Sequence, residues 1–358
     1  MQRRSVMQHG NEALWLPRPG GRPRPGPAPY TAPAAGELVV RARAVAVNPV
    51  DAIPGIARRV VTPWLTYPAV LGSDVAGEVV EVGDGVTRFR PGDRALGHAI
   101  GQERSRDRAA EGAFQRYVVL VEHMASRVPD GLGYEHGAVL PLGLSTAAAG
   151  LFEADQLALA LPSLDAPDRA ASVVVWGAST SVGSNAVQLA RCAGYDVIGT
   201  ASPRNFEYVR RLGAREVFDY HERDVGGRVV DALRGRELAG ILAIGRGSLP
   251  RAVSVARRCE GSRRVASAYP TPVTTARAAL ARRRGVQVSA IWGGTPSESP
   301  VGPALYGAFL GEALDAGRYL AAPHPEVVGS DLSAIPEALS RLRRGVSATK
   351  LVVTLPAG

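Results

Sequence analysis

A glycine-rich turn that follows a buried strand carries the clearest chemical signal in the chain. Val173 to Trp176 form a short apolar run typical of a buried strand, and the next residues are small and open a helical pattern. Gly177 lets the chain turn sharply, and Gly183 lets the helix pack closely on the strand. The free N–H groups of the helix N-terminus then attract a pyrophosphate. The candidate phosphate-binding residues are Gly177, Ala178, Ser179, Thr180, Ser181, Val182 and Gly183.

The turn departs at one position from the G-x-G-x-x-G pattern of dinucleotide sites. Ser179 stands where that pattern has its second glycine, so the strand–turn–helix context supplies most of the support. The alternative interpretation is a tight turn between strand and helix with no ligand.

The end of the next strand, residues 196–201, indicates which dinucleotide would bind. NAD sites place an Asp or Glu there to hold the ribose hydroxyls, but Asp196 comes at the start of the strand. Ser202, Arg204 and Asn205 follow the strand instead, and they can donate hydrogen bonds or pair with a 2′-phosphate. This pattern favours NADPH. The alternative is that Ser202 caps a helix and Arg204 faces solvent.

The elements around this turn predict two kinds of structure. Strands and helices alternate from about residue 136, which predicts an α/β fold with a doubly wound parallel sheet. Residues 1 to about 130 are rich in strands, with a Pro- and Gly-rich extended surface segment at 17–36. The charged segment 101–112 is predicted to be an exposed, mobile loop.

Composition argues against nucleic acid and membranes as partners. The net charge is +9, but nearly all cations are arginines, Lys350 is the only lysine, and the basic clusters lack interleaved aromatics. No apolar run approaches the ~20 residues of a membrane span. Only Cys192 and Cys259 are present, so a reducing, cytoplasmic location is expected.

Several motifs occur in a specific order and spacing with the glycine-rich turn: VNPVD at 47–51, LGSDVAGEVVEVG at 71–83, RPGDR at 90–94, GAFQ at 112–115 and KLVV at 350–353. Together they resemble the medium-chain dehydrogenase/reductase superfamily over essentially the whole chain. Further stretches look like its zinc-free quinone-oxidoreductase-like branch, close to the trans-acting enoyl reductases of polyketide pathways; they are residues 97–99, 200–206, 217–220 and 324–329.

The resemblance implies a division of labour between two domains. Residues 1–135 and 300–358 would form a GroES-like catalytic domain, and residues 136–299 a Rossmann domain that binds NADPH in the cleft between them. Ser202, Arg204, Asn205 and Tyr220 would surround the adenosine phosphate. Asn48, Asp51 and Thr146 are the candidate catalytic residues, with Asn48 and Thr146 near the nicotinamide. The alternative role for Thr146 is helix capping.

The positions of zinc ligands in related alcohol dehydrogenases are changed here. Asn48 stands in place of a Cys, and Gly72-Ser73-Asp74 stands in place of Gly-His-Glu. Two cysteines are too few for a structural Cys₄ site. We therefore expect no metal.

One residue departs from the branch in a way that bears on mechanism. Its pattern commonly reads Asn-Pro-Val-Asp-x-Lys, and here Ile53 replaces the lysine. The leading prediction is an NADPH-dependent, zinc-independent reductase that transfers hydride to an activated (enoyl or enone) double bond in secondary metabolism. The alternatives are a quinone or imine/iminium reductase, or a repurposed cyclase or NADPH-binding module without net redox turnover. The substrate would be a small molecule, with a carrier-bound acyl chain as one form, and the protein a monomer or homodimer.

Overall fold

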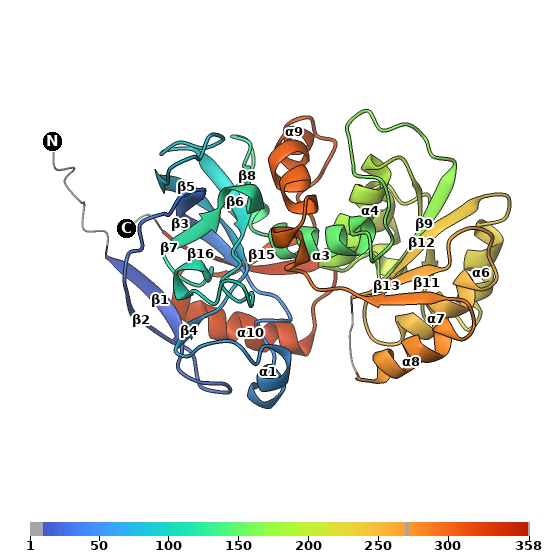
Figure 1. The fold of residues 1–358 in the computed structure, drawn as a ribbon, viewed down its shortest axis with the longest axis horizontal. Helices are drawn as coiled ribbons and strands as arrows, with labels where there is room; N and C mark the ends of the chain where they lie inside the picture. Colours follow the sequence, from blue (N-terminus) through green and yellow to red (C-terminus); the bar gives the residue numbers. More distant parts are fainter. Residues whose placement is uncertain (1–9, 269–271, 357–358) are drawn as a thin grey trace. The chain divides into compact units, whose positions relative to one another are not determined.

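The computed structural model describes residues 10–268 and 272–356, and the chain divides into two compact units (Figure 1). The first unit contains the chain up to Ala138, Glu326–Gly345 and the residues from Leu351 onward. The second contains Val139–Pro325 and Val346–Lys350. Residues 300–325 thus pack with the second unit, although the sequence boundary placed them in the catalytic domain.

A buried tyrosine explains that difference. Tyr306 lies in η5 (Pro303–Phe309), a π-helical segment that precedes α9 (Leu310–Asp315). Its hydroxyl donates to the Pro141 carbonyl at 2.7 Å and lies 2.8 Å from the Ser145 hydroxyl, both in α3 (Pro141–Phe152). These buried hydrogen bonds attach the segment to the second unit.

The first unit consists mainly of β-structure. One sheet has seven strands in the order β15-β16-β3-β5-β6-β8, with β7 also pairing with β3, and the pairs from β16 to β8 are antiparallel. A second sheet has the order β2-β1-β4. The strands are β1 (Asn11–Leu16), β2 (Arg24–Ala28), β3 (Glu37–Ala46), β4 (Ala69–Val70), β5 (Asp74–Val82), β6 (Arg94–His98), β7 (Tyr117–Val121), β8 (Ala125–Arg127), β15 (His324–Gly329) and β16 (Thr349–Thr354); the helices are α1 (Gly55–Val61), α2 (Tyr134–Gly137) and α10 (Ile335–Arg344).

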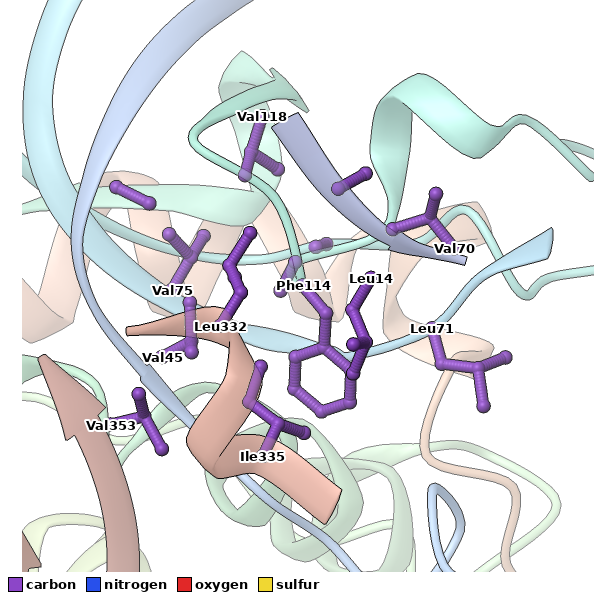
Figure 2. Packing of buried hydrophobic residues seen from close by; sticks show 14 of the residues in the cluster. Leu14, Val45, Val70, Leu71, Val75, Phe114, Val118, Leu332, Ile335 and Val353 are labelled. Carbon is purple, nitrogen blue, oxygen red and sulfur yellow. The ribbon is translucent and has the colours of Figure 1, made fainter. Parts of the chain in front are cut away.

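The core of this unit joins the two sheets and a helix. Figure 2 shows the ring of Phe114 beside Leu14 of β1, with Val45 of β3 and Ile335 of α10 in the same cluster. Gly72 must stay a glycine there, since its φ is +94° and an added Cβ would lie 2.5 Å from the Phe114 ring. The Pro-rich segment 17–36 includes β2, an edge strand, which is where sheets tolerate proline.

The prediction of an exposed loop at 101–112 is wrong. Glu111 is fully buried, and Arg106 and Arg108 each pair with Glu111 and with Glu37 at 2.6 Å. Burial alone would raise the pKa of Glu37, but the Ala34 N–H and the two guanidinium groups outweigh it and lower that pKa. The charges that suggested solvent exposure therefore form a network within the protein.

The second unit is built on a six-stranded parallel sheet in the order β11-β10-β9-β12-β13-β14. This order confirms the predicted doubly wound α/β fold. Its strands are β9 (Ala171–Trp176), β10 (Asp196–Ala201), β11 (Glu216–Asp219), β12 (Glu237–Ala243), β13 (Arg264–Ser267) and β14 (Gln287–Ala290); the remaining helices are α4 (Ser181–Cys192), α5 (Phe206–Arg211), α6 (Val225–Ala232), α7 (Ser248–Ala256) and α8 (Pro272–Arg282).

Helices cover both faces of this sheet. Successive residues of a strand point to opposite faces. In β12, Leu242 contacts Gly150 of α3, whereas Ile241 and Ala243 belong to a core shared with α6 and α7, including Leu249. The sheet is therefore enclosed on both sides, as its continuous apolar strands indicate.

The structure bears on two predictions made from composition, those on membrane spans and on the cysteines. Within the ranges that the structure describes, no helix combines the length and hydropathy that a membrane span requires. Cys192 and Cys259 are both free thiols, and partial burial raises the pKa of each.

Candidate functional site

The carboxyl ends of four parallel strands meet at one edge of the second unit's sheet. Trp176 at the end of β9 is in register with Thr200 of β10 and with Ala243 of β12, and Ala201 is in register with Asp219 of β11. β9 lies between β10 and β12 in the sheet. The chain continues from β9 to β10 and β11 on one side, and then returns to the other side of β9 to form β12. Such a reversal point is where open α/β sheets bind nucleotides.

The turn after β9 is held by hydrogen bonds to the neighbouring strand. Gly177 has a φ of +84°, and its N–H donates to the Thr200 hydroxyl at 3.1 Å. The next N–H, of Ala178, donates to the Thr200 carbonyl at 2.9 Å. Thr200 therefore fixes the turn from β10, a role that sequence reasoning missed because a threonine inside a strand carries no motif.

A threonine cap and a glycine then start α4. The Thr180 hydroxyl accepts the Gly183 N–H at 3.0 Å and donates to the Gly177 carbonyl at 2.8 Å. A Cβ on Gly183 would lie 2.2 Å from the Gly177 oxygen. The helix can begin this close to the strand only because residue 183 lacks a side chain.

The start of α4 fits a phosphate group. The N–H groups of Ser181 and Val182 lie in the first helical turn, where no preceding turn of helix supplies carbonyl acceptors. The small side chains at 178–181 leave the backbone accessible, and the helix terminus carries partial positive charge. A pyrophosphate would satisfy these donors.

The residues after β10 form a polar cluster beside the turn. The Ser202 hydroxyl lies 3.1 Å from the Tyr220 hydroxyl. The Asn205 amide donates to the hydroxyls of Ser179 at 3.3 Å and Ser347 at 3.0 Å. The structure thus brings together four of the predicted cofactor residues. It adds Ser347, which follows α10 and which sequence order could not connect to this edge.

Three further observations bear on the cofactor alternatives. Ser202 precedes the short helix η3 (Pro203–Asn205) but makes no side-chain cap there. Arg204 is exposed, and no ion pair of its guanidinium is found in the described ranges. Asp196 lies at the opposite end of β10, where it pairs with Arg215 at 2.8 Å. No carboxylate therefore terminates β10.

The predicted catalytic residues Asn48 and Asp51 belong to a buried polar cluster in the first unit. The Asn48 amide donates to the Asp74 carboxylate at 2.8 Å. The Asp51 carboxylate accepts the N–H groups of Asn48 at 2.9 Å and Gly72 at 3.2 Å. Burial and the nearby Asp74 raise the pKa of Asp51 to about 6, against the lowering effect of the Asn48 N–H.

At position 48 the chain offers an amide in place of a thiolate. Asn48 turns its NH₂ group toward Asp74, and an NH₂ group has no lone pair to give a cation. Within the described residues, no group of three or more His, Cys, Asp or Glu side chains is arranged to hold a metal ion.

Thr146 lies within α3 of the second unit and not at its start. Its hydroxyl donates to the Leu142 carbonyl one turn earlier at 2.7 Å, so the capping alternative is wrong. A Cβ on Gly293 would lie 2.6 Å from the Thr146 oxygen. The hydroxyl proton is used in this hydrogen bond, so toward any other group the Thr146 oxygen can only accept a hydrogen bond.

Comparison with known proteins assigns the family. Residues 34–130 match the alcohol dehydrogenase GroES-like domain. The chain is 46% identical to dehydrogenase azaJ of Aspergillus niger, covering 92% of this chain and 94% of that protein. It is 34% identical to trans-enoyl reductase himH of Aspergillus japonicus, covering 96% and 97%.

A solved structure shares the fold. The CurK enoyl reductase superposes with a TM-score of 0.76 at 20% identity, covering 97% of this chain and 100% of that one. Such low identity supports the fold alone, whereas the longer and closer sequence matches show the family. The chain therefore belongs to the medium-chain dehydrogenase/reductase superfamily of oxidoreductases, close to its enoyl reductases.

Proposed function

We propose that the protein is a zinc-independent reductase that uses NADPH to reduce a carbon–carbon double bond conjugated to a carbonyl. The observation that carries the cofactor choice is the polar cluster after β10, where Ser202, Asn205 and Tyr220 gather and no carboxylate ends the strand. Relatives named trans-enoyl reductases support the enoyl substrate class and a role in secondary metabolism.

The cofactor-binding roles follow from donor chemistry. The N–H groups of Ser181 and Val182 would hold the pyrophosphate. Ser202 and Asn205 would hydrogen-bond the adenosine ribose and its 2′-phosphate. Arg204 would pair with that phosphate, since its guanidinium is exposed and uncommitted to an acid in the described chain.

NADPH, when bound, supplies the hydride of the reaction. Reduction of a conjugated double bond then leaves negative charge on the carbonyl oxygen and requires one proton at carbon. Ile53 cannot provide that proton. Thr146 can stabilise the oxygen only if its hydroxyl leaves the Leu142 carbonyl. Solvent water or a substrate hydroxyl remains the proton source that this arrangement favours.

The first experiment compares cofactors and substrates with the purified protein. Binding of NADPH and NADH is measured by calorimetry, and their oxidation is followed by absorbance with an enone, a quinone and a cyclic imine. Preferential NADPH oxidation with the enone supports the proposal. Turnover only with the quinone or imine moves the assignment to those reductases. Binding without oxidation of any substrate would instead identify a module that has lost redox turnover.

A matched pair of variants tests the cofactor site. Arg204→Gln should weaken NADPH binding by about 10- to 100-fold, because a charge-assisted contact with phosphate is worth about 1.5–3 kcal/mol, and it should leave NADH binding unchanged. Arg215→Gln is the control, because Arg215 is an exposed arginine that pairs with Asp196 at the opposite end of β10. Equal effects of the two substitutions on NADPH would contradict the assignment of the 2′-phosphate site.

Zinc independence needs its own measurement. Elemental analysis of the active protein, and activity after treatment with a chelator, should show less than stoichiometric metal and no loss of rate. A stoichiometric transition metal whose removal abolishes turnover would refute this part of the proposal.

A further inference from the structure

The short helix α1 buries an arginine and exposes hydrophobic side chains, the reverse of an ordinary surface helix. Arg58 is only 2% exposed, while Ile56 and Val60 are 86% and 78% exposed. Arginine is almost never fully buried unless it is paired or hydrogen-bonded, because its charge must be stripped of water. The inward arginine therefore requires a specific partner.

The partner is the loop that carries the candidate catalytic residues. One terminal nitrogen of Arg58, Nη2, donates to the carbonyls of Val50 at 3.0 Å and Asp51 at 2.9 Å. The loop also receives a hydrogen bond on the Ala52 carbonyl, from Arg343 of α10 at 3.3 Å. Arg58 thus fixes the backbone at the residue whose side chain accepts the Asn48 N–H.

The charge of Arg58 matters as well as its hydrogen bonds. The buried carboxylates of Asp51 and Asp74 repel each other, and Arg58 is the cation whose field opposes this repulsion at Asp51. Ile53, two residues after Asp51, contributes no charge. The positive charge that acts on Asp51 therefore comes from the following helix.

We propose that Arg58 is the positioning residue that holds the 48–53 loop and keeps Asp51 ionised. The proposal rests on the proposed function for its catalytic meaning, since the loop carries Asn48 and Asp51. Its structural part, the coupling of Arg58 to Asp51, stands independently of any substrate.

Several neighbouring elements contribute charged or polar groups, and Lys350 of β16 is a further buried cation, next to the Leu351 whose carbonyl accepts the Val47 N–H. Besides Arg58 of α1 and Asp74 of β5, these are His98, which is opposite Asp74 in the β5–β6 pair, and Gln102, whose amide lies 3.4 Å from the Asp51 carboxylate. Of these groups, Arg58 is the cation that lowers the pKa of Asp51. Removing that charge should raise the pKa of Asp51 above its value of about 6.

Three buried polar atoms near this cluster lack protein partners, which suggests ordered water. They are the other terminal nitrogen of Arg58, the hydroxyl of Tyr67 and the side-chain oxygen of Gln102. The charge of Arg58 acts on Tyr67, so the two side chains are neighbours. One buried water can satisfy two or more such atoms and would leave the Arg58 charge in place.

The decisive experiment measures stability against pH without cofactor or substrate. The variants are Arg58→Gln, Arg58→Lys and Asp51→Asn, with Arg59→Gln as the control because Arg59 is the exposed neighbour on the same helix. A raised pKa in the folded state means that stability is full below the unfolded pKa, near 4, and is lost as pH rises through the folded pKa. This decline should end near pH 6 in the wild-type protein and be absent in Asp51→Asn.

The expected results separate charge from packing. In Arg58→Gln the decline should extend upward by about one pH unit or more. Arg58→Lys, which keeps the charge, and Arg59→Gln should both keep the wild-type profile. Arg58→Gln should also lower the melting temperature much less in the Asp51→Asn background than in the wild-type protein.

The proposal would be overturned if Arg58→Gln lowered the melting temperature equally in the wild-type and Asp51→Asn backgrounds. It would also be overturned if that substitution left the dependence of stability on pH unchanged. The pH profile of kcat/KM with NADPH and an enone then tests the catalytic meaning. The rise in the Asp51 pKa that Arg58→Gln causes in the stability profile should reappear in the profile of kcat/KM. Coupling in stability without any turnover would refute the proposed function and leave the role of Arg58 in holding the loop intact.

Discussion

Gly183→Ala is a substitution for which helix propensity and close packing predict opposite signs. Gly183 is the third residue of α4, and alanine is a better helix former than glycine by about 1 kcal/mol. Propensity alone therefore predicts a more stable protein. The geometry of the turn predicts the reverse.

The magnitude follows from the contacts that the new methyl group would make. An added Cβ would lie 2.2 Å from the Gly177 oxygen and 2.7 Å from the Ala178 Cα, both backbone atoms. Ordinary contact begins at 3.4 Å, so the helix start must move by about 1 Å from the strand. Overpacking of this kind costs about 1–3 kcal/mol, and it displaces the donors that would hold a pyrophosphate.

The assay pairs thermal unfolding with NADPH titration, and Gly226→Ala is the matched control. Gly226 is the second residue of α6, where a Cβ would meet only a methyl group of Val255 at 4.0 Å. Gly183→Ala should lower the melting temperature of the second unit by about 2–10 °C and abolish NADPH binding, while Gly226→Ala should leave both unchanged or raise stability slightly. A Gly183→Ala protein that is more stable and still binds NADPH would refute the close-packing argument.

Further predictions concern polar groups inside each unit. Glu37→Gln should cost about 1–3 kcal/mol at pH 7, because Arg106 and Arg108 lose a buried acid. The lowered pKa of Glu37 stabilises the folded protein above pH 4.5. In urea unfolding, the free energy of unfolding should therefore fall less in the variant than in the wild type as pH drops below that value. Parallel plots of this free energy against pH would contradict the prediction. Tyr319→Phe should cost about 1–2 kcal/mol, because the fully buried hydroxyl donates to Asn185 of α4 at 2.6 Å; a change in melting temperature below 1 °C would show that the bond contributes little.

The nucleotide-binding unit could be predicted closely from sequence because its signals are local. The apolar run ending at Trp176, the small residues after it and the glycine at 183 each act on their own chain neighbours, so order along the chain suffices. The same holds for the absence of an acid at the end of β10. What the local pattern could not give is the contribution of Thr200 and Ser347, which reach the turn from other elements.

The segment 101–112 shows why composition misleads where opposite charges meet. Six charged residues among twelve look like a solvated loop when only the segment itself is considered. Glu37 supplies a second acid from a strand that is distant in sequence, and the two acids then neutralise Arg106 and Arg108 inside the protein. Exposure of a charged segment thus depends on whether the rest of the fold provides counter-charges, and hydropathy does not contain that information.

Helix α1 presents the same problem in its most direct form. Its sequence, GIARRVV, gives no sign of which arginine turns inward, because Arg58 and Arg59 are adjacent and chemically identical. Burial of one of them is favourable only where an acid and carbonyl acceptors lie within reach of its guanidinium. For Arg58, the loop before the helix provides them. In the proposed arrangement the positive charge of Arg58 acts on Asp51 from the inner side of the helix. Loss of Arg58 should therefore be compensated only by restoring a cation near Asp51, so charge, and not side-chain volume, is the property that a replacement for Arg58 must keep.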